Sequence, residues 1–250
     1  MKLQKFFEEH PAAAIAFSGG ADSAYLLAEA LRAGCRVRPY FVKGPFQPAF
    51  ELEDARRLCA QLGAELTVLA ADPLADPEVV ANGPRRCYYC KKAIFGALLA
   101  AARADGFAEL WDGTNASDDA QDRPGMKALE ELQVLSPLRL CGVPKTQVRA
   151  RSRELGLFTW EKPAYACLAT RIPTGTAITA GALERVEAAE GALFALGFTD
   201  FRVRVLGELA RLQLPAAQLA AAAEKHGAIT RALNPWFSGV LLDLTPRREE

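Results

Sequence analysis

The chain has 250 residues, half of them hydrophobic, which suits one large domain or two modest ones. Its 30 Lys and Arg residues balance 30 Asp and Glu residues, so the bulk charge lacks the basic excess typical of proteins that bind nucleic acids. We therefore expect a small-molecule substrate and no nucleic-acid partner. The charged stretch at residues 2–9 is unlike a secretory signal, and the longest apolar run, residues 93–102, is shorter than the roughly 20 residues of a membrane span. A soluble, cytoplasmic protein with no membrane partner is expected.

The first part of the chain alternates strand and helix patterns. Residues 12–17 form an apolar run between Pro11 and Ser18, which is typical of a buried parallel strand. A helical pattern follows and ends at Gly34, a common helix stop. The alternation predicts an α/β fold whose parallel sheet is covered on both faces, with ligands beyond the carboxyl ends of the strands. The remaining predicted strands are residues 36–42, 65–70 and 109–112, and the predicted helices are residues 22–33, 51–62 and 91–104.

The pattern changes after an ordered loop at residues 163–175. A small α+β unit with a split βαβ arrangement is predicted there. We place the boundary near residue 172, which gives domains of residues 1–172 and 173–250. The predicted elements are a helix at 183–196, strands at 201–206 and 209–214 joined by a turn at Gly207, a helix at 219–233 and a strand at 239–244.

A glycine-rich string, Ser18-Gly19-Gly20-Ala21-Asp22-Ser23, lies between the first strand and the first helix. Its glycines let the backbone turn sharply, and the freed N–H groups form a cradle for phosphate oxygens with the helix N-terminus. Ser18 and Ser23 can add hydroxyl donors, and Asp22 is suited to hold Mg²⁺. A turn that only caps a helix is the alternative, but the full string in this context favours nucleotide binding. The hexapeptide resembles the loop of the N-type ATP pyrophosphatases, the PP-loop enzymes.

Three of the six cysteines form a candidate reactive set. Cys87 and Cys90 form a C-x-x-C pair just before a predicted helix, and Cys167 lies between Lys162 and Arg171. A helix start and flanking cations favour thiolates. No His lies nearby in sequence to complete a tetrahedral zinc site, whereas three thiolates around a [4Fe-4S] cluster leave one iron open to sulfide. Buried packing thiols are the alternative, and they are the expectation for Cys35, Cys59 and Cys141.

Together these motifs resemble one family, the ATP-dependent sulfur transferases of nickel-pincer nucleotide cofactor biosynthesis (LarE type). The resemblance implies an α/β PP-loop sheet of the adenine nucleotide alpha hydrolase type, a smaller C-terminal α+β domain and a homo-oligomer. It also implies that carboxylates of pyridinium-3,5-biscarboxylic acid mononucleotide are adenylated and converted to thiocarboxylates. The matching strings are residues 18–23, 86–91, 112–115, 118–119, 123–125, 136–138, 162–171, Glu190 and residues 202–204.

The resemblance also implies roles for individual residues. It implies ATP, Mg²⁺ and a [4Fe-4S] cluster, the cluster held by Cys87, Cys90 and Cys167. Arg202 and Arg204 would meet the substrate phosphate, with a solvated strand face as the alternative. The residues implied in ATP binding are Ser18, Gly19, Gly20, Asp22, Ser23, Asp112, Thr114 and Asn115.

Three further positions are assigned with alternatives left open. Glu190 would be a polar or metal-binding helper, with an exposed helix residue as the alternative. Arg171 is a further candidate beside Cys167. Gln213 follows Ala210-Arg211-Leu212, where the family often has an acidic residue, and this departure puts any metal or substrate role at that position in doubt.

Members of the family differ in their sulfur source. Some give up the sulfur of a cysteine that matches Cys167, whereas others carry a further cysteine pair and a cluster. Cys87 and Cys90 make this chain resemble the cluster type, in which Cys167 is also the catalytic position. The other functions left open are a cluster-dependent tRNA thiolase, an amide-forming synthetase that uses ammonia, and an ATP-sensing or iron–sulfur carrier protein.

Overall fold

The computed structural model describes residues 2–118 and 124–247. Within these ranges the chain forms two compact units: unit 1 comprises Met1–Asp76 and Arg85–Lys162, and unit 2 comprises Pro77–Pro84 and Pro163–Glu250. The domain boundary near residue 172 stays a prediction. Asp119 and Arg123, which belong to the family-like strings, lie outside the described residues. No helix in the described ranges is long and apolar enough to cross a membrane.

Unit 1 is built on a parallel sheet with the strand order β3-β2-β1-β4. This sheet confirms the predicted α/β class. Its central strand is apolar throughout because both of its faces are covered: Ala13, Ala14 and Ile15 are fully buried. The strands are β1 (Ala12–Ala16), β2 (Arg36–Lys43), β3 (Thr67–Ala70) and β4 (Leu110–Trp111).

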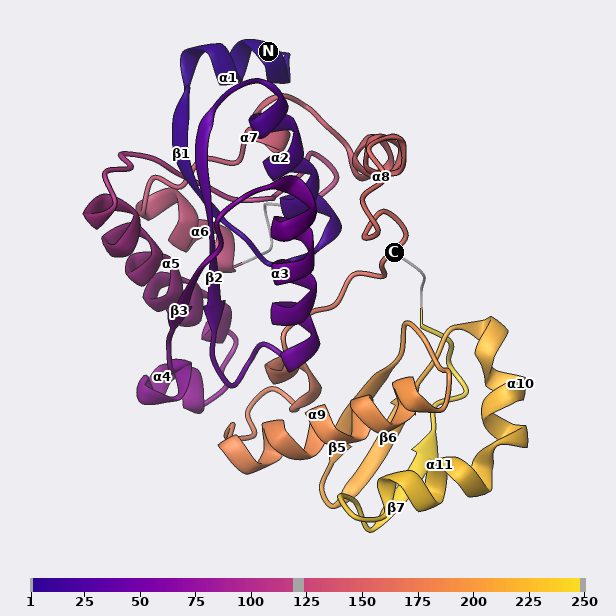
Figure 1. Ribbon diagram of the computed structural model, residues 1–250. Helices are drawn as coiled ribbons and strands as arrows, with labels where there is room; N and C mark the ends of the chain where they lie inside the picture. Colours follow the sequence, from indigo (N-terminus) through magenta and orange to yellow (C-terminus); the bar gives the residue numbers. More distant parts are fainter. Residues whose placement is uncertain (1, 119–123, 248–250) are drawn as a thin grey trace. The chain divides into compact units, whose positions relative to one another are not determined.

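Helices cover both faces of this sheet (Figure 1). Side chains alternate along β1, so Ala13 and Ile15 pack into one hydrophobic core and Ala14 into the other. The first core includes residues of α1 (Leu3–Glu9), α2 (Ala21–Arg32), α3 (Ala49–Leu62), α7 (Pro137–Leu140) and α8 (Lys145–Glu154). The second core includes residues of α5 (Arg86–Ala104) and α6 (Pro124–Glu131). Unit 1 also contains a short 3-10 helix, η1 (Pro73–Ala75).

Unit 2 contains a second, smaller sheet in the order β5-β6-β7. Strands β5 (Arg202–Leu206) and β6 (Leu209–Gln213) form an antiparallel hairpin, and β6 pairs in parallel with β7 (Gly239–Leu242). Helix α9 (Ala180–Ala195) contacts β5, and α11 (His226–Leu233) contacts β7. The other elements are α4 (Pro77–Val80), the 3-10 helix η2 (Leu168–Arg171) and α10 (Ala216–Glu224).

The helix predicted at residues 219–233 is wrong as a single element. It is divided into α10 and α11 at Lys225, whose ψ of 11° departs from the helical value of about −42°. The predicted pattern was continuous because apolar residues recur at helical spacing on both sides of this residue. Local backbone geometry, which periodicity does not report, separates the two helices.

The segment Pro77–Pro84 belongs to unit 2 through hydrogen bonds to the loop that precedes α9. The buried Asn82 side chain donates from Nδ2 to the carbonyl oxygens of Pro173 (2.9 Å) and Thr176 (3.0 Å). The Gly175 N–H donates to the carbonyl of Asn82 at 2.9 Å. These bonds fix the end of the loop predicted to be ordered at residues 163–175.

Candidate active site

The predicted phosphate loop lies at the carboxyl end of β1 and leads directly into α2. Hydroxyl groups hold it closed: the Ser18 backbone N–H donates to Ser23 Oγ at 3.3 Å, and the Ser18 and Ser23 hydroxyls lie 3.2 Å apart. Ser23 Oγ also donates to the Gly20 carbonyl at 3.3 Å. The loop is therefore ordered by its own side chains, and its glycines bring N–H groups to the start of α2, where the helix dipole favours anions.

Gly19 allows the loop to pass close to α3. Its φ is +70°, and a Cβ atom at this position would lie 3.0 Å from the Glu51 carbonyl oxygen and 3.2 Å from the Ala55 backbone nitrogen. Both the backbone conformation and the lack of space require glycine here. Glycine is therefore required at position 19 both for its backbone conformation, as predicted from the sequence, and for lack of space beside α3.

Asp22 lies in the first turn of α2 and is held by two side chains from distant parts of unit 1. Asn115 Nδ2 donates to Asp22 Oδ1 at 3.1 Å, and Lys145 Nζ pairs with Asp22 Oδ2 at 2.5 Å. The carboxylate therefore has one neutral and one cationic partner, beside the phosphate loop. Asp22 and Asn115 were both predicted for the ATP site, whereas Lys145 was not.

The segment after β4 packs against the start of α2. Asp112 is buried and accepts hydrogen bonds from Thr114 Oγ1 at 2.6 Å and from the Thr114 N–H at 3.2 Å. A Cβ atom on Gly113 would lie 2.9 Å from the Ser23 nitrogen, so the two segments are in direct contact. Because β1 and β4 are parallel neighbours, their carboxyl ends meet at one edge of the sheet. Unit 1 thus brings the predicted ATP residues together, while ATP binding itself stays a prediction.

One feature of the sequence could have pointed to Lys145 as a site residue. It is the first residue of α8, directly after Pro144. A cation at a helix N-terminus opposes the helix dipole, so such a residue calls for a reason outside its own helix. That reason is the contact with Asp22, which connects positions 123 residues apart and which no local pattern could predict.

Cys87 and Cys90 lie inside helix α5, which corrects their predicted place before the helix. The helix begins at Arg86, and its first turns carry both thiols on one side because they are three residues apart. Cys87 is exposed, Cys90 is half-buried, and Arg86 Nη2 donates to Cys87 Sγ at 3.4 Å.

The third cysteine lies in unit 2, directly before the 3-10 helix η2. Cys167 is half-buried. Its carbonyl oxygen accepts hydrogen bonds from the Thr170 N–H at 3.0 Å and from Thr170 Oγ1 at 2.9 Å. Arg171 Nη1 donates to the carbonyl of Ala166 at 2.8 Å. The backbone of this loop is therefore fixed on both sides of the thiol. Among the residues that the structure describes, no group of three or more His, Cys, Asp or Glu side chains is gathered as a metal site.

Glu190 anchors this cysteine loop from helix α9. Its carboxylate forms a two-point ion pair with Arg171, at 2.8 Å to Nε and 3.0 Å to Nη2, and both side chains are almost fully buried. Glu190 also accepts hydrogen bonds from the Val203 N–H at 2.9 Å and from the Tyr165 hydroxyl. Glu190 is thus buried, not an exposed helix residue, and it ties α9, β5 and the loop together.

The cation that precedes the cysteine loop has its own carboxylate. Lys162 Nζ pairs with Asp54 Oδ2 at 2.6 Å within unit 1, just as Arg171 pairs with Glu190. Both cations that flank Cys167 in sequence are therefore engaged by carboxylates.

Arg202 and Arg204 lie on the same face of β5 and form the centre of a positively charged cluster. Arg202 is buried and donates to the carbonyl oxygens of Phe201 and Ala164. Burial, followed by repulsion from Arg171 and Arg247, lowers the pKa of Arg202 to about 10. Burial and the same two arginines also lower the pKa of Arg204. The cluster consists of Arg171, Arg202, Arg204 and Arg247, with Glu190 and Asp200 as the nearby carboxylates. Its positive charges outnumber its negative ones, which suits a bound anion.

Gln213 connects Arg204 to an acidic residue on the far side of the hairpin. Gln213 Oε1 accepts from Arg204 Nε, and Gln213 Nε2 donates to Asp243 Oδ2 at 2.8 Å. Asp243 also pairs with Arg211. The glutamine thus orients Arg204 and connects it to the carboxylate of Asp243, and a metal or substrate role at position 213 stays in doubt.

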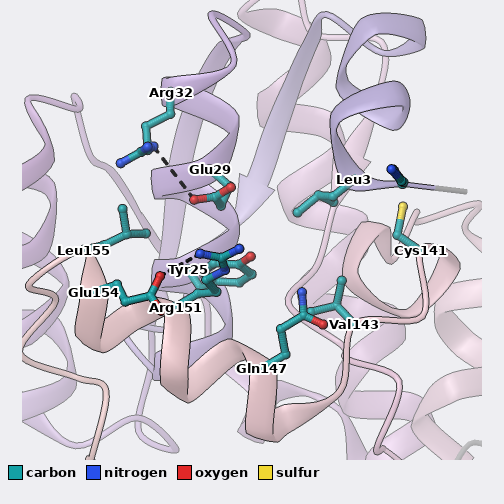
Figure 2. Close-up of a pocket in the computed structure, with 11 residues that line it drawn as sticks. Leu3, Tyr25, Glu29, Arg32, Cys141, Val143, Gln147, Arg151, Glu154 and Leu155 are labelled. Atoms are coloured by element: carbon teal, nitrogen blue, oxygen red, sulfur yellow. Dashed lines mark hydrogen bonds and ion pairs between the residues drawn. The ribbon is translucent and has the colours of Figure 1, made fainter.

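A cavity of about 640 Å³ lies elsewhere in unit 1, between α1, α2 and α8 (Figure 2). Its polar lining includes Tyr25, Glu29 and Arg151. Burial, with the nearby Glu29 carboxylate, raises the pKa of Tyr25. The lining contains none of the predicted site residues, although the half-buried Cys141 contributes to it.

The fold and these contacts define an α/β protein with a PP-loop-type parallel sheet and a second, smaller sheet. No family model matches the chain. The chain is 35% identical over 233 residues to the pyridinium-3,5-bisthiocarboxylic acid mononucleotide synthase of Lactiplantibacillus plantarum, which covers 92% of this chain and 84% of the synthase. The chain therefore belongs to the family of this synthase, the LarE type.

Two further relatives are named only as uncharacterized proteins. An uncharacterized protein of Synechocystis sp. is 37% identical over 218 residues, which cover 87% of this chain and 81% of that protein. An uncharacterized protein of Methanocaldococcus jannaschii is 30% identical over 203 residues, which cover 80% and 76% of the two chains. In each of the three relatives, the similarity extends over more than two thirds of both chains.

Proposed function

We propose that this protein is an ATP-dependent sulfur transferase that converts carboxylates of pyridinium-3,5-biscarboxylic acid mononucleotide into thiocarboxylates. The observation that carries the proposal is the closed phosphate loop at the carboxyl end of β1, with Asp22 in the first turn of α2, in a chain of this synthase family. The name of the L. plantarum relative supports the product class, and the loop supports the use of a nucleotide.

The proposed chemistry begins with activation of the acid. A carboxylate is a poor electrophile, so one of its oxygens first bonds to the α-phosphorus of ATP while pyrophosphate leaves. The loop N–H groups stabilise the negative charge that grows on pyrophosphate. Mg²⁺, when bound, neutralises part of that charge, and Asp22 is the residue suited to hold it. A sulfur nucleophile then attacks the acyl carbon, and AMP departs with the bonding electron pair.

The sulfur source rests on the three cysteines. Cys87 and Cys90 are one helical turn apart at the accessible start of α5, an arrangement that fits two ligands of an iron–sulfur cluster. Cys167 would be the third ligand, from a loop that Arg171 holds. A [4Fe-4S] cluster with three protein ligands supplies an open iron position that can hold sulfide. Without a cluster, the Cys167 thiolate itself would be the donor.

The proposal is tested by comparing cysteine variants under anaerobic conditions, with pyrophosphate release and thiocarboxylate product measured separately. We expect Cys167→Ala to release pyrophosphate but to form no thiocarboxylate, because the adenylation step does not use the Cys167 thiol. Cys141→Ala is the control and should keep both activities. Loss of thiocarboxylate in Cys87→Ala supports the cluster. A Cys87→Ala protein that makes product once and loses one H₂S in mass supports donation from Cys167. Formation of ADP in place of AMP, or product from Cys167→Ala, would contradict the proposed function.

Binding of the substrate phosphate is expected to depend on pH through Arg202. Its pKa is lowered to about 10 by burial and by Arg171 and Arg247, and a bound phosphate favours its protonated form. The phosphate monoester keeps its dianionic form above its second pKa of about 6. Affinity for the mononucleotide should therefore be steady from neutral pH upward and fall as pH passes the lowered pKa of Arg202. Arg202→Gln should bind more weakly and lose this fall, as measured by calorimetry. If the affinity of the wild type and of Arg202→Gln changes with pH in the same way, Arg202 does not bind the substrate phosphate.

A further inference from the structure

The cavity between α1, α2 and α8 has polar side chains where two packed helices usually carry apolar ones. Its volume of about 640 Å³ is within the range of small-molecule sites. The lining residues on α2 and α8 are Tyr25, Glu29, Arg32, Gln147, Arg151 and Glu154. On each helix they recur at the spacing i, i+4, i+7, which places side chains on one face. Because helices pack through apolar side chains at such positions, these two polar faces are better suited to a bound polar molecule than to packing.

The most buried residue of the lining carries a hydroxyl group with no protein partner. Tyr25 is only 3% exposed, and its hydroxyl makes no hydrogen bond to any residue within 2–118 or 124–247. The charges of Glu29 and Arg151 act on this hydroxyl, which lies with them between the two helices (Figure 2). Its raised pKa keeps it protonated at neutral pH, so it can donate a hydrogen bond. Since a buried hydroxyl without a partner is unfavourable, this donor is left for whatever fills the cavity.

Each of the two helices also contributes one cation and one carboxylate. On α2, Arg32 Nε lies 3.9 Å from Glu29 Oε1, and on α8, Arg151 Nη1 lies 2.6 Å from Glu154 Oε2. The first distance is longer than a hydrogen bond, so the Glu29 carboxylate keeps its capacity to accept one. Glu29 is also the least exposed of these four side chains, at 30%. A ligand with one sign of charge would be repelled by half of this set, whereas a zwitterion finds a partner for each of its charges.

We propose that this cavity is a binding site for a free α-amino acid with a large apolar side chain. The carboxylate of the ligand accepts hydrogen bonds from the Tyr25 hydroxyl and from Arg151, and its ammonium group donates to Glu29. Its side chain is removed from water by the apolar part of the lining. This apolar part includes Leu3, Val143 and Leu155. The site is separate from the phosphate loop, and the inference does not rest on the proposed function.

The class of ligand is tested by calorimetry on the full chain with L-leucine and L-phenylalanine. Each amino acid is compared with the analogue that lacks only its ammonium group, 4-methylpentanoate or 3-phenylpropanoate. The analogues that lack only the carboxylate are 3-methylbutylamine and phenethylamine. We expect the amino acids to bind and every analogue to bind at least about tenfold more weakly, the effect of losing one hydrogen bond to a charged group. No affinity for either amino acid, or equal affinity for an analogue, would overturn the proposal.

The place of the site is tested with two variants that each lose one hydroxyl of unit 1. Tyr25→Phe should bind the amino acids about tenfold more weakly or worse. Tyr40→Phe is the control, because the Tyr40 hydroxyl already donates to Asp105, outside the cavity, and it should bind them as the wild type does. Glu29→Gln should bind 4-methylpentanoate as tightly as leucine. Equal affinities in the two phenylalanine variants would show that the ligand does not occupy this cavity.

Thermal unfolding shows whether the Tyr25 hydroxyl is free for a ligand. Without a protein partner it adds nothing to stability, so Tyr25→Phe should melt at or above the temperature of the wild type. Tyr40→Phe, which loses a hydrogen bond within the protein, should melt at a lower temperature. Weaker binding by Tyr25→Phe is then not a folding defect. A lower melting temperature for Tyr25→Phe than for Tyr40→Phe would show that the hydroxyl serves the fold, and would overturn its assignment to a ligand.

Discussion

Replacing Glu190 with alanine is expected to lower the free energy of unfolding of unit 2 by about 3–5 kcal/mol, the range for removal of one partner of a buried ion pair. The variant leaves the guanidinium group of Arg171 buried with no carboxylate, since the two side chains are only 0% and 2% exposed. It also removes the acceptor of the Val203 N–H. Urea unfolding followed by circular dichroism measures the effect.

Two further variants separate the ion pair from a general effect on α9. Glu184→Ala removes an exposed carboxylate from the same helix and should change stability by less than about 0.5 kcal/mol. The double variant Glu190→Leu with Arg171→Met should be more stable than Glu190→Ala, because neither charge is then left unpaired. Because Arg171 also holds the carbonyl of Ala166, alkylation of Cys167 should be faster in Glu190→Ala. If Glu190→Ala loses no more stability than Glu184→Ala, the ion pair does not hold the cysteine loop.

Replacing Gly19 with alanine is expected to remove most of the affinity for ATP with Mg²⁺. The new Cβ would lie 3.0 Å from the Glu51 carbonyl oxygen, where backbone atoms leave no room, and the φ of +70° disfavours any side chain. The loop must move, and its N–H groups then miss the phosphates. Loss of two hydrogen bonds to a charged group, at about 1.5–3 kcal/mol each, corresponds to about 100-fold or more in affinity.

Gly63→Ala is the matched control for this loop variant. Gly63 has nearly the same φ, +67°, but a Cβ atom there meets nothing within 4 Å. Because an alanine there must adopt a left-handed backbone, Gly63→Ala should lower the free energy of unfolding by about 1–2 kcal/mol. Its affinity for ATP, measured by calorimetry, should be unchanged. The comparison therefore isolates the close approach to α3. A Gly19→Ala protein that binds ATP as tightly as Gly63→Ala would show that the loop does not hold the nucleotide.

The sheet of unit 1 could be predicted because buried parallel strands are continuous apolar runs between clear helix stops. The 12–17 run became β1, and Gly34 and Gly63 follow the ends of α2 and α3. The sheet order could not be predicted, since β1 lies between β2 and β4 through contacts distant in sequence. The predicted start of α5 at residue 91 is too late, since the helix begins at Arg86 and the residues around Cys87 show no helical periodicity.

The candidate site could be predicted where its residues are adjacent in sequence. It could not be predicted where residues distant in sequence come into contact. The loop from Ser18 to Ser23 and the Asp112 segment were found because each follows a strand. Lys145 was missed because only the folded chain brings it to Asp22. The pairing of Glu190 with Arg171 was also missed, since two residues 19 positions apart on different elements share no pattern.

Helix α8 contacts two distant parts of unit 1. Lys145 at its first position contacts Asp22, and Arg149, one turn later, donates to the carbonyl oxygens of Trp160 at 3.0 Å and Lys162 at 3.3 Å. Because a single helix of ten residues makes both sets of contacts, a substitution that displaces α8 should disturb the surroundings of Asp22 and the backbone at Lys162 together.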